Sequence, residues 1–154
     1  MEDCFVRGLI LYSLWLLPVS WFDITRRRIP DVFSFGCLLS LIALMIITGC
    51  RPWLPSLVSA AAASGFLLLL RALTSRSIGL GDVKFAASSG ALLPGLQWLP
   101  ALSIASLSAL LVFIPLLISG RIGRRFRVPF GPFIGIGTIA AALLAAERFS
   151  PAGF

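Results

Sequence analysis

The chain is a succession of six apolar stretches separated by short segments rich in Pro, Gly, Ser or Arg. A helix needs about 20 mostly apolar residues to cross a ~30 Å hydrocarbon core. The composition agrees, because 58% of residues are hydrophobic, 12% are charged and the mean hydropathy is +1.01, whereas soluble domains carry about 25% charged residues. We expect an all-α polytopic membrane bundle, one domain over residues 1–154, with predicted spans at Val6–Phe22, Val32–Gly49, Leu54–Leu73, Phe85–Leu99, Ala101–Ser119 and Phe133–Ala146.

The distribution of basic residues predicts the orientation of this bundle. Short loops rich in Lys and Arg stay on the cytoplasmic side of the membrane. Ten of the thirteen basic residues follow the first, third and fifth stretches, namely Arg26, Arg27, Arg28, Arg71, Arg76, Lys84, Arg121, Arg124, Arg125 and Arg127. Only Arg7, Arg51 and Arg148 lie on the opposite side, so both termini are predicted to face outward.

Two aspartates, Asp23 and Asp82, lie at the edges of apolar stretches, and the predicted orientation puts both at the cytoplasmic face. Carboxylates are costly at a bilayer, so such a pair indicates a functional site. The fourth stretch, which Asp82 precedes, is rich in Ala, Ser and Gly, and small residues let helices approach closely, so this span is predicted to be central. Two adjacent carboxyl groups share a proton and can act as acid and base in proteolysis.

Each aspartate also has a structural interpretation. Asp82 could cap the fourth helix, and Asp23 could be a solvated counter-charge for Arg26–Arg28. Asp31 directly precedes the second stretch and is interpreted as the N-cap of that helix. The glycines before Asp82, Gly79 and Gly81, are expected to permit positive φ angles and a close backbone approach.

The joint order of these motifs resembles the type IV prepilin peptidase family of GxGD membrane aspartyl proteases. The matching residues are Asp23, then Ile29-Pro30, then Gly79-Leu80-Gly81-Asp82-Val83-Lys84, then Val128-Pro129-Phe130-Gly131-Pro132-Phe133. They occur in the family's order and at the corresponding helix borders, so the resemblance covers nearly the whole chain.

The resemblance implies an aspartic endopeptidase of the cytoplasmic (inner) membrane that cleaves the basic leader from type IV prepilins or pseudopilins at the cytoplasmic face. It assigns Asp23 and Asp82 as the catalytic pair. Supporting positions are Gly79, Gly81 and Lys84 of the GxGDxK motif and Pro129, Gly131 and Pro132 of the PFGP segment. Asp31 stands where the family commonly has Asn, at a position that is not catalytic in the family.

Bifunctional members of the family carry an additional N-terminal region with a cytoplasmic insert, often bearing CxxC motifs and associated with N-methylation. This chain resembles the short forms that lack it, so methyltransferase activity is not expected. The acidic start, Met1-Glu2-Asp3, and the missing cleavage site also argue against a removable signal peptide.

The residue inventory limits the other chemistries. The chain has no histidine, which removes Ser-His, Cys-His and HExxH sites, and neither a metal nor a cofactor is expected. Cys4, Cys37 and Cys50 form no CxxC pair, so we expect free thiols rather than a disulfide or zinc site. The net charge of +7 is interpreted as topology and lipid contact rather than nucleic-acid binding.

Two other classes of function remain open at this point. A small proton- or cation-coupled transporter could use Asp23 and Asp82 as ion sites. It would need a polar path through the bilayer, but no predicted span has an ionisable residue near its middle except Arg71, which lies near an end. A non-catalytic assembly partner with a degenerate protease fold is disfavoured because both aspartates are present.

Overall fold

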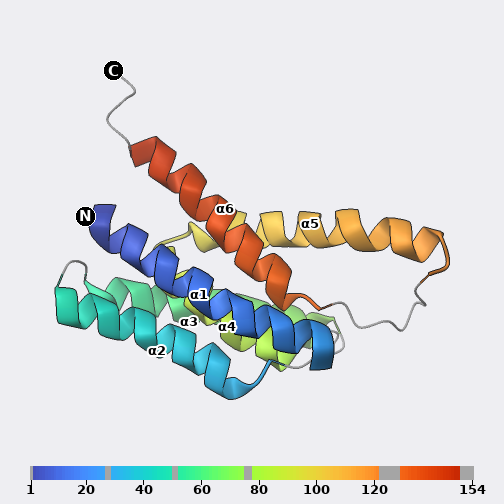
Figure 1. The fold of residues 1–154 in the computed structure, drawn as a ribbon, viewed down its shortest axis with the longest axis horizontal. Helices are drawn as coiled ribbons and strands as arrows, with labels where there is room; N and C mark the ends of the chain where they lie inside the picture. The colour runs from blue at the N-terminus through green and yellow to red at the C-terminus, as the bar shows by residue number, and fades with distance from the viewer. Residues whose placement is uncertain (1, 27–28, 50–51, 75–77, 122–128, 150–154) are drawn as a thin grey trace.

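A computed structural model describes residues 2–26, 29–49, 52–74, 78–121 and 129–149. Within these ranges the chain forms helices and no strand, which confirms the predicted all-α fold (Figure 1). The helices are α1 (Glu2–Arg26), α2 (Asp31–Thr48), α3 (Trp53–Leu73), α4 (Leu80–Leu92), α5 (Trp98–Ile118) and α6 (Gly131–Phe149).

Four of these helices, α1, α2, α3 and α5, are long and apolar enough to cross a membrane. The protein is thus a multi-pass membrane protein. The predicted fourth span, Phe85–Leu99, is wrong at its end, because α4 stops at Leu92 and α5 already begins at Trp98. Pro94 cannot donate a backbone hydrogen bond and Gly95 adopts a left-handed φ of 68°. These two residues turn the chain between α4 and α5, so α4 ends before it is long enough to be a full span.

The short helix α4 is the centre of the bundle and contacts every other helix. Its side chains are buried continuously from Phe85 to Leu92. The closest approach is to α3, where a Cβ added to Gly90 would lie 2.4 Å from the carbonyl oxygen of Ser59. The small residues of the fourth stretch therefore pack α4 against its neighbours, as the sequence predicts.

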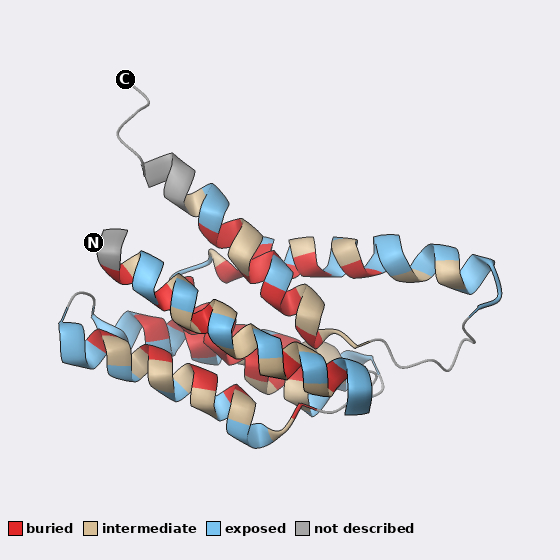
Figure 2. Ribbon diagram, viewed as in Figure 1, coloured by how far each residue is buried: buried red, intermediate tan, exposed pale blue. Residues whose placement is uncertain are grey.

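The longest helix, α1, presents opposite faces to the bundle and to the surroundings (Figure 2). The buried face includes Cys4, Tyr12, Val19 and Asp23. The exposed face is also apolar, with Val6, Ile10, Leu14, Leu17 and Trp21. Successive residues of each stripe lie three, four, seven or eight positions apart, as expected of one face of a helix. An apolar outer stripe of this length is suited to lipid rather than water.

The alternating course of the helices brings several helix ends together. The end of α1, the starts of α2 and α4, and the start of α6 lie at the same end of the bundle, whereas α1 begins at the other end (Figure 1). The C-terminal half of α5 extends away from the other helices (Figure 1). Seven of the basic residues that define the predicted orientation lie outside the described residues, namely Arg27, Arg28, Arg51, Arg76, Arg124, Arg125 and Arg127.

The expectation that the cysteines are free thiols is wrong for Cys4, which is disulfide-bonded. Cys37 is a free thiol buried in the bundle. Spacing along the chain gave no indication of the disulfide, because the helical fold determines which cysteines meet. Cys4 lies in the first turns of α1, at the opposite end of that helix from Asp23.

Candidate active site

Asp23 lies in the last turn of α1 and its side chain is buried, with 5% of its surface exposed. The carboxylate oxygen Oδ2 accepts a hydrogen bond of 2.8 Å from the backbone N–H of Gly131, the first residue of α6. The N-terminus of a helix carries a partial positive charge and unpaired N–H groups, which together favour a bound carboxylate. This contact fixes Asp23 inside the bundle, and the alternative that it is a solvated counter-charge for the arginines is wrong.

Asp82 lies in the first turn of α4 and is also buried, with 8% of its surface exposed. The pKa of its carboxyl group is raised to about 7, mainly by burial and then by the charge of Asp23, whereas a backbone hydrogen bond from Gly79 opposes the shift. The charge of Asp23 contributes to this shift, so the two carboxyl groups lie within electrostatic reach of each other. The contact with Gly79 is of the capping type, so Asp82 also caps the start of α4.

Ile29 packs against the start of α4, which carries Asp82, and the start of α6, which binds Asp23 through Gly131. A Cβ added to Gly81 would lie 2.9 Å from Cβ of Ile29, and one added to Gly131 would lie 3.1 Å from Cδ1 of the same side chain. A Cβ on Gly131 would also lie 2.9 Å from Oδ2 of Asp23. Ile29 is buried, with 7% of its surface exposed. Both glycines are therefore needed for space around one isoleucine.

The prediction that Gly79 and Gly81 adopt positive φ angles is wrong. Gly79 has a φ of −66°, and Gly81 is part of α4 without a positive φ. The predicted close approach is present at both residues. A Cβ on Gly79 would lie 2.9 Å from Oδ2 of Asp82, so this glycine leaves room for the carboxylate to fold back over the helix start.

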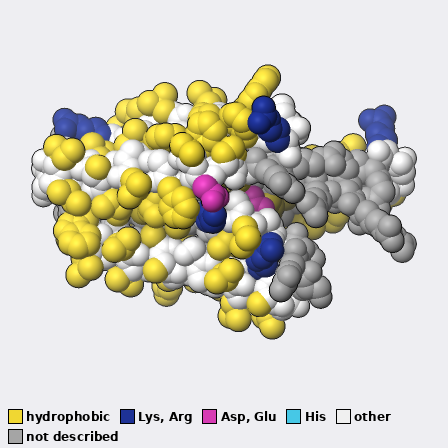
Figure 3. All heavy atoms as spheres, turned by 90° about the horizontal axis from the view of Figure 1, so that it is seen from below, with side chains coloured by type: hydrophobic (Ala, Val, Ile, Leu, Met, Phe, Trp, Pro, Cys, Tyr) yellow, Lys and Arg dark blue, Asp and Glu magenta, His cyan; other side chains and the backbone are white. Residues whose placement is uncertain are grey.

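Lys84 points away from the buried carboxyl groups and forms an ion pair of 2.6 Å with Asp31. Its ammonium group also lies 5.4 Å from the centre of the Phe35 ring. Asp31 is the first residue of α2, and Pro30 is the N-cap, so the expected capping role of Asp31 is wrong. Acidic side chains lie near the middle of the face in Figure 3, beside Lys and Arg and among apolar side chains. The ion pair joins α2 to α4 at the edge of the site.

The remaining predicted residues, Pro129 and Pro132, are half-buried beside Gly131, and Pro132 is suited to the first turn of α6 because that turn needs no N–H from it. Sequence reasoning missed the direct bond between Gly131 and Asp23 and the part played by Ile29. Both residues belong to motifs quoted from the sequence, but their contacts join segments that are distant in the sequence, 108 residues apart for Gly131 and Asp23. Within the described ranges, no group of three or more His, Cys, Asp or Glu side chains could hold a metal ion.

Comparison with known proteins gives a family and one relative. The model of the type IV leader peptidase family matches residues 10–116. The chain is 30% identical over 134 residues to a prepilin leader peptidase/N-methyltransferase of Bacillus subtilis. This alignment covers 87% of the chain and 54% of the relative, so the chain spans about half the length of that protein. No solved structure matches the chain significantly.

Proposed function

The chain belongs to the type IV leader peptidase family, and from this premise we propose that it is a membrane aspartic endopeptidase acting on type IV prepilins or pseudopilins. The observation that supports this most strongly is the pair of buried carboxyl groups, Asp23 from α1 and Asp82 from α4, at one end of the bundle. We assign these two residues as catalytic, within one membrane-embedded domain over residues 1–154. The supporting residues are Gly79, Gly81, Lys84, Pro129, Gly131 and Pro132.

The unlike surroundings of the two carboxyl groups suggest their roles. Burial disfavours the ionised form of Asp23, and the N–H of Gly131 at the start of α6 offsets part of this cost. Burial and the neighbouring negative charge favour the protonated form of Asp82. In the proposed mechanism Asp23 takes a proton from the attacking water, and Asp82 donates its proton toward the scissile carbonyl oxygen. Proton transfer of this kind contributes roughly 10²–10⁴ in rate. The two groups titrate as one coupled pair.

The site is proposed to face the cytoplasm from the inner membrane. Basic residues in the loops at this end support that orientation, and they are suited to contact lipid headgroups. The disulfide-bonded Cys4 at the opposite end of α1 supports it independently, because disulfides persist in oxidising compartments outside the cytoplasm. A basic leader held on the cytoplasmic side would then reach the two aspartates at the membrane border.

A cleavage assay tests the function directly. The protein, reconstituted in lipid vesicles, is incubated with candidate prepilins, and the products are identified by mass spectrometry. We expect a single cut at the end of the basic leader, unaffected by a metal chelator, and no cut with Asp23→Asn. If the inserted wild-type protein cleaves no prepilin while the same vesicles conduct protons or cations, the transporter interpretation replaces this one.

A further inference from the structure

Three hydroxyl groups from three helices meet in the interior of the bundle, away from the aspartates. The Tyr12 oxygen of α1 lies 3.0 Å from Oγ of Ser89 on α4 and donates to Oγ1 of Thr138 on α6 at 3.3 Å. Oγ1 of Thr138 lies 2.8 Å from Oγ of Ser89 and 2.7 Å from the carbonyl oxygen of Ile134. All three side chains are fully buried. We call these residues the hydroxyl cluster.

The hydroxyl cluster joins the same three helices that carry the site, and it joins them on the same faces. Ser89 follows Asp82 on α4 by about two helical turns, and Thr138 follows Gly131 on α6 by about two turns. Tyr12 precedes Asp23 on α1 by about three turns. Residues separated by whole turns share a helix face. Each helix is therefore attached at two points of one face, the site and the hydroxyl cluster.

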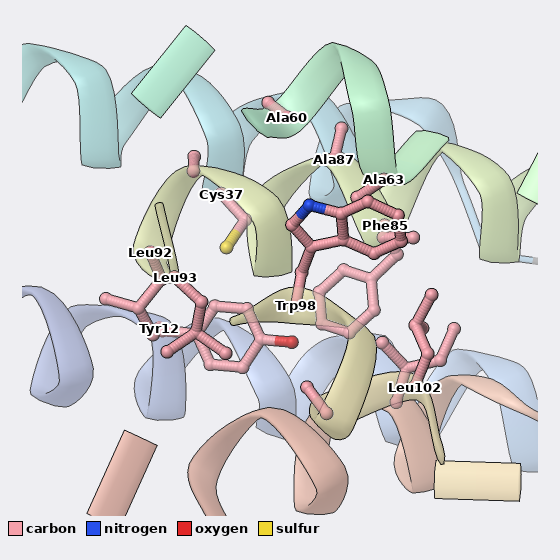
Figure 4. Close-up of a cluster of buried hydrophobic side chains, with 14 of the residues drawn as sticks. Tyr12, Cys37, Ala60, Ala63, Phe85, Ala87, Leu92, Leu93, Trp98 and Leu102 are labelled. Atoms are coloured by element: carbon pink, nitrogen blue, oxygen red, sulfur yellow. The ribbon is translucent and has the colours of Figure 1, made fainter. Parts of the chain in front are cut away.

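Tyr12 also connects the cluster to the helix turn that carries Asp82. Its ring stacks on Phe85, with the ring centres 5.5 Å apart, and Phe85 lies one turn after Asp82 on α4. Figure 4 shows Tyr12 and Phe85 in one group of buried side chains, with the Tyr12 hydroxyl directed toward the middle of the group. The hydroxyl groups have only one another and a helix carbonyl as partners among the described contacts.

A helix that shifted along its axis would break these hydrogen bonds in an apolar interior. A buried hydroxyl without a partner is costly there, whereas apolar side chains can slide past one another at small cost. A shift of one residue moves a helix by about 1.5 Å, and a misplacement of about 1 Å at reacting groups can reduce a rate by roughly 10². Hydrogen bonds between membrane helices thus specify register more sharply than apolar packing does.

We propose that Tyr12, Ser89 and Thr138 are positioning residues that fix the register of α1, α4 and α6, so that Asp23, Asp82 and the N–H of Gly131 meet. The inference rests on the proposed function, because its readout is peptide cleavage. It adds a set of residues that lie away from the reacting atoms and belong to none of the motifs quoted from the sequence. The cluster makes no contact with substrate in this proposal.

The test compares variants that remove one hydroxyl and keep the side-chain shape. Thr138→Val and Tyr12→Phe are each expected to lower kcat by roughly 10- to 100-fold, with KM changed less than about threefold. Thr138→Ser restores the hydroxyl and is expected to recover most of kcat. The matched control is Ser103→Ala, because the exposed Ser103 hydroxyl bonds only the Leu99 carbonyl of its own helix, at 3.0 Å. It should leave both constants unchanged.

Each outcome supports or overturns the inference. Wild-type kcat in an inserted Thr138→Val or Tyr12→Phe protein overturns it. A fall in kcat that follows a lower melting temperature and that Thr138→Ser does not restore also overturns it, because the residue is then merely structural. If the Thr138→Val protein does not insert into the membrane, Tyr12→Phe provides the test instead, because it keeps the ring stacked on Phe85 and removes only the hydroxyl. Failure of the wild-type protein to cleave would instead contradict the proposed function and is visible before any variant is made.

Discussion

Asp23 and Asp82 face one site but differ in what surrounds them. Asp23 is held by a backbone N–H at the start of α6, whereas Asp82 lies at the start of its own helix, beside the charge of Asp23. Sequence motifs predicted Asp23 and Asp82 as the pair of carboxyl groups. They could not predict this asymmetry, because it depends on Gly131, which lies far away along the chain and reaches Asp23 only after α6 has packed on α1.

Replacing either aspartate by asparagine keeps the size of the side chain and removes the shared proton. Asp23→Asn and Asp82→Asn should each lower kcat/KM for leader cleavage, measured in vesicles, by a factor of roughly 10²–10⁴. Asp31→Asn is the matched control. It removes only the ion pair between Asp31 and Lys84 at the surface, which is worth about 0–1 kcal/mol, so this variant should retain activity. An inactive Asp31→Asn together with an active Asp23→Asn would mean that the catalytic pair is misassigned.

The raised pKa of Asp82 predicts how the rate depends on pH. Asp82 must be protonated to act as the acid, and its pKa of about 7 means that the protonated fraction falls as pH rises above neutrality. kcat/KM should therefore decrease about tenfold per pH unit on the alkaline side, measured from initial rates between about pH 5 and 9 with the same vesicles. A rate that stays constant up to about pH 9 would show that Asp82 is not the proton donor.

At the scale of helices, the site depends on how closely their ends approach. The sequence correctly predicted a close approach at Gly81 but wrongly attributed it to a positive φ angle. Gly81 has no positive φ because α4 already begins at Leu80. The GLGD motif could be interpreted as a loop before a helix, but α4 already includes Leu80 and Gly81. The end of α4 was similarly missed, because the apolar composition continues through Pro94-Gly95 to Leu99.

One methyl group at Gly81 should test this approach. In Gly81→Ala the new Cβ would lie 2.9 Å from Cβ of Ile29, an atom next to the backbone that cannot move aside. Cleavage should fall by roughly tenfold or more because the start of α4 is displaced. Gly65→Ala in α3 is the control, since nothing lies within 4 Å of its added Cβ and alanine favours helices. Equal activity in both variants would remove the argument that Gly81 is required for space.

At the scale of the whole molecule, the composition and the six apolar stretches predicted a multi-pass helical bundle, and the structure agrees. Hydropathy alone could not distinguish a full span from the short, buried α4, because both are apolar, and only packing shows that α4 is enclosed by the other helices. The disulfide at Cys4 was missed for a similar reason. The orientation of the bundle in the membrane stays a prediction, supported by loop charge and by the position of that disulfide.

Labelling with a membrane-impermeant maleimide tests this orientation on intact cells. A reporter in Pro52→Cys, before α3, should react from outside, whereas one in Arg121→Cys, at the exposed end of α5, should react only after the membrane is permeabilised. The wild-type protein, labelled in parallel, gives the background from the native cysteines: Cys4 is disulfide-bonded, Cys37 is buried, and Cys50 lies outside the described residues. Labelling of the Arg121→Cys protein in intact cells, with protection of the Pro52→Cys protein, would place Asp23 and Asp82 on the outer face. A leader retained in the cytoplasm could not reach them there, and the proposed prepilin substrates would be wrong even if the carboxyl pair were catalytic.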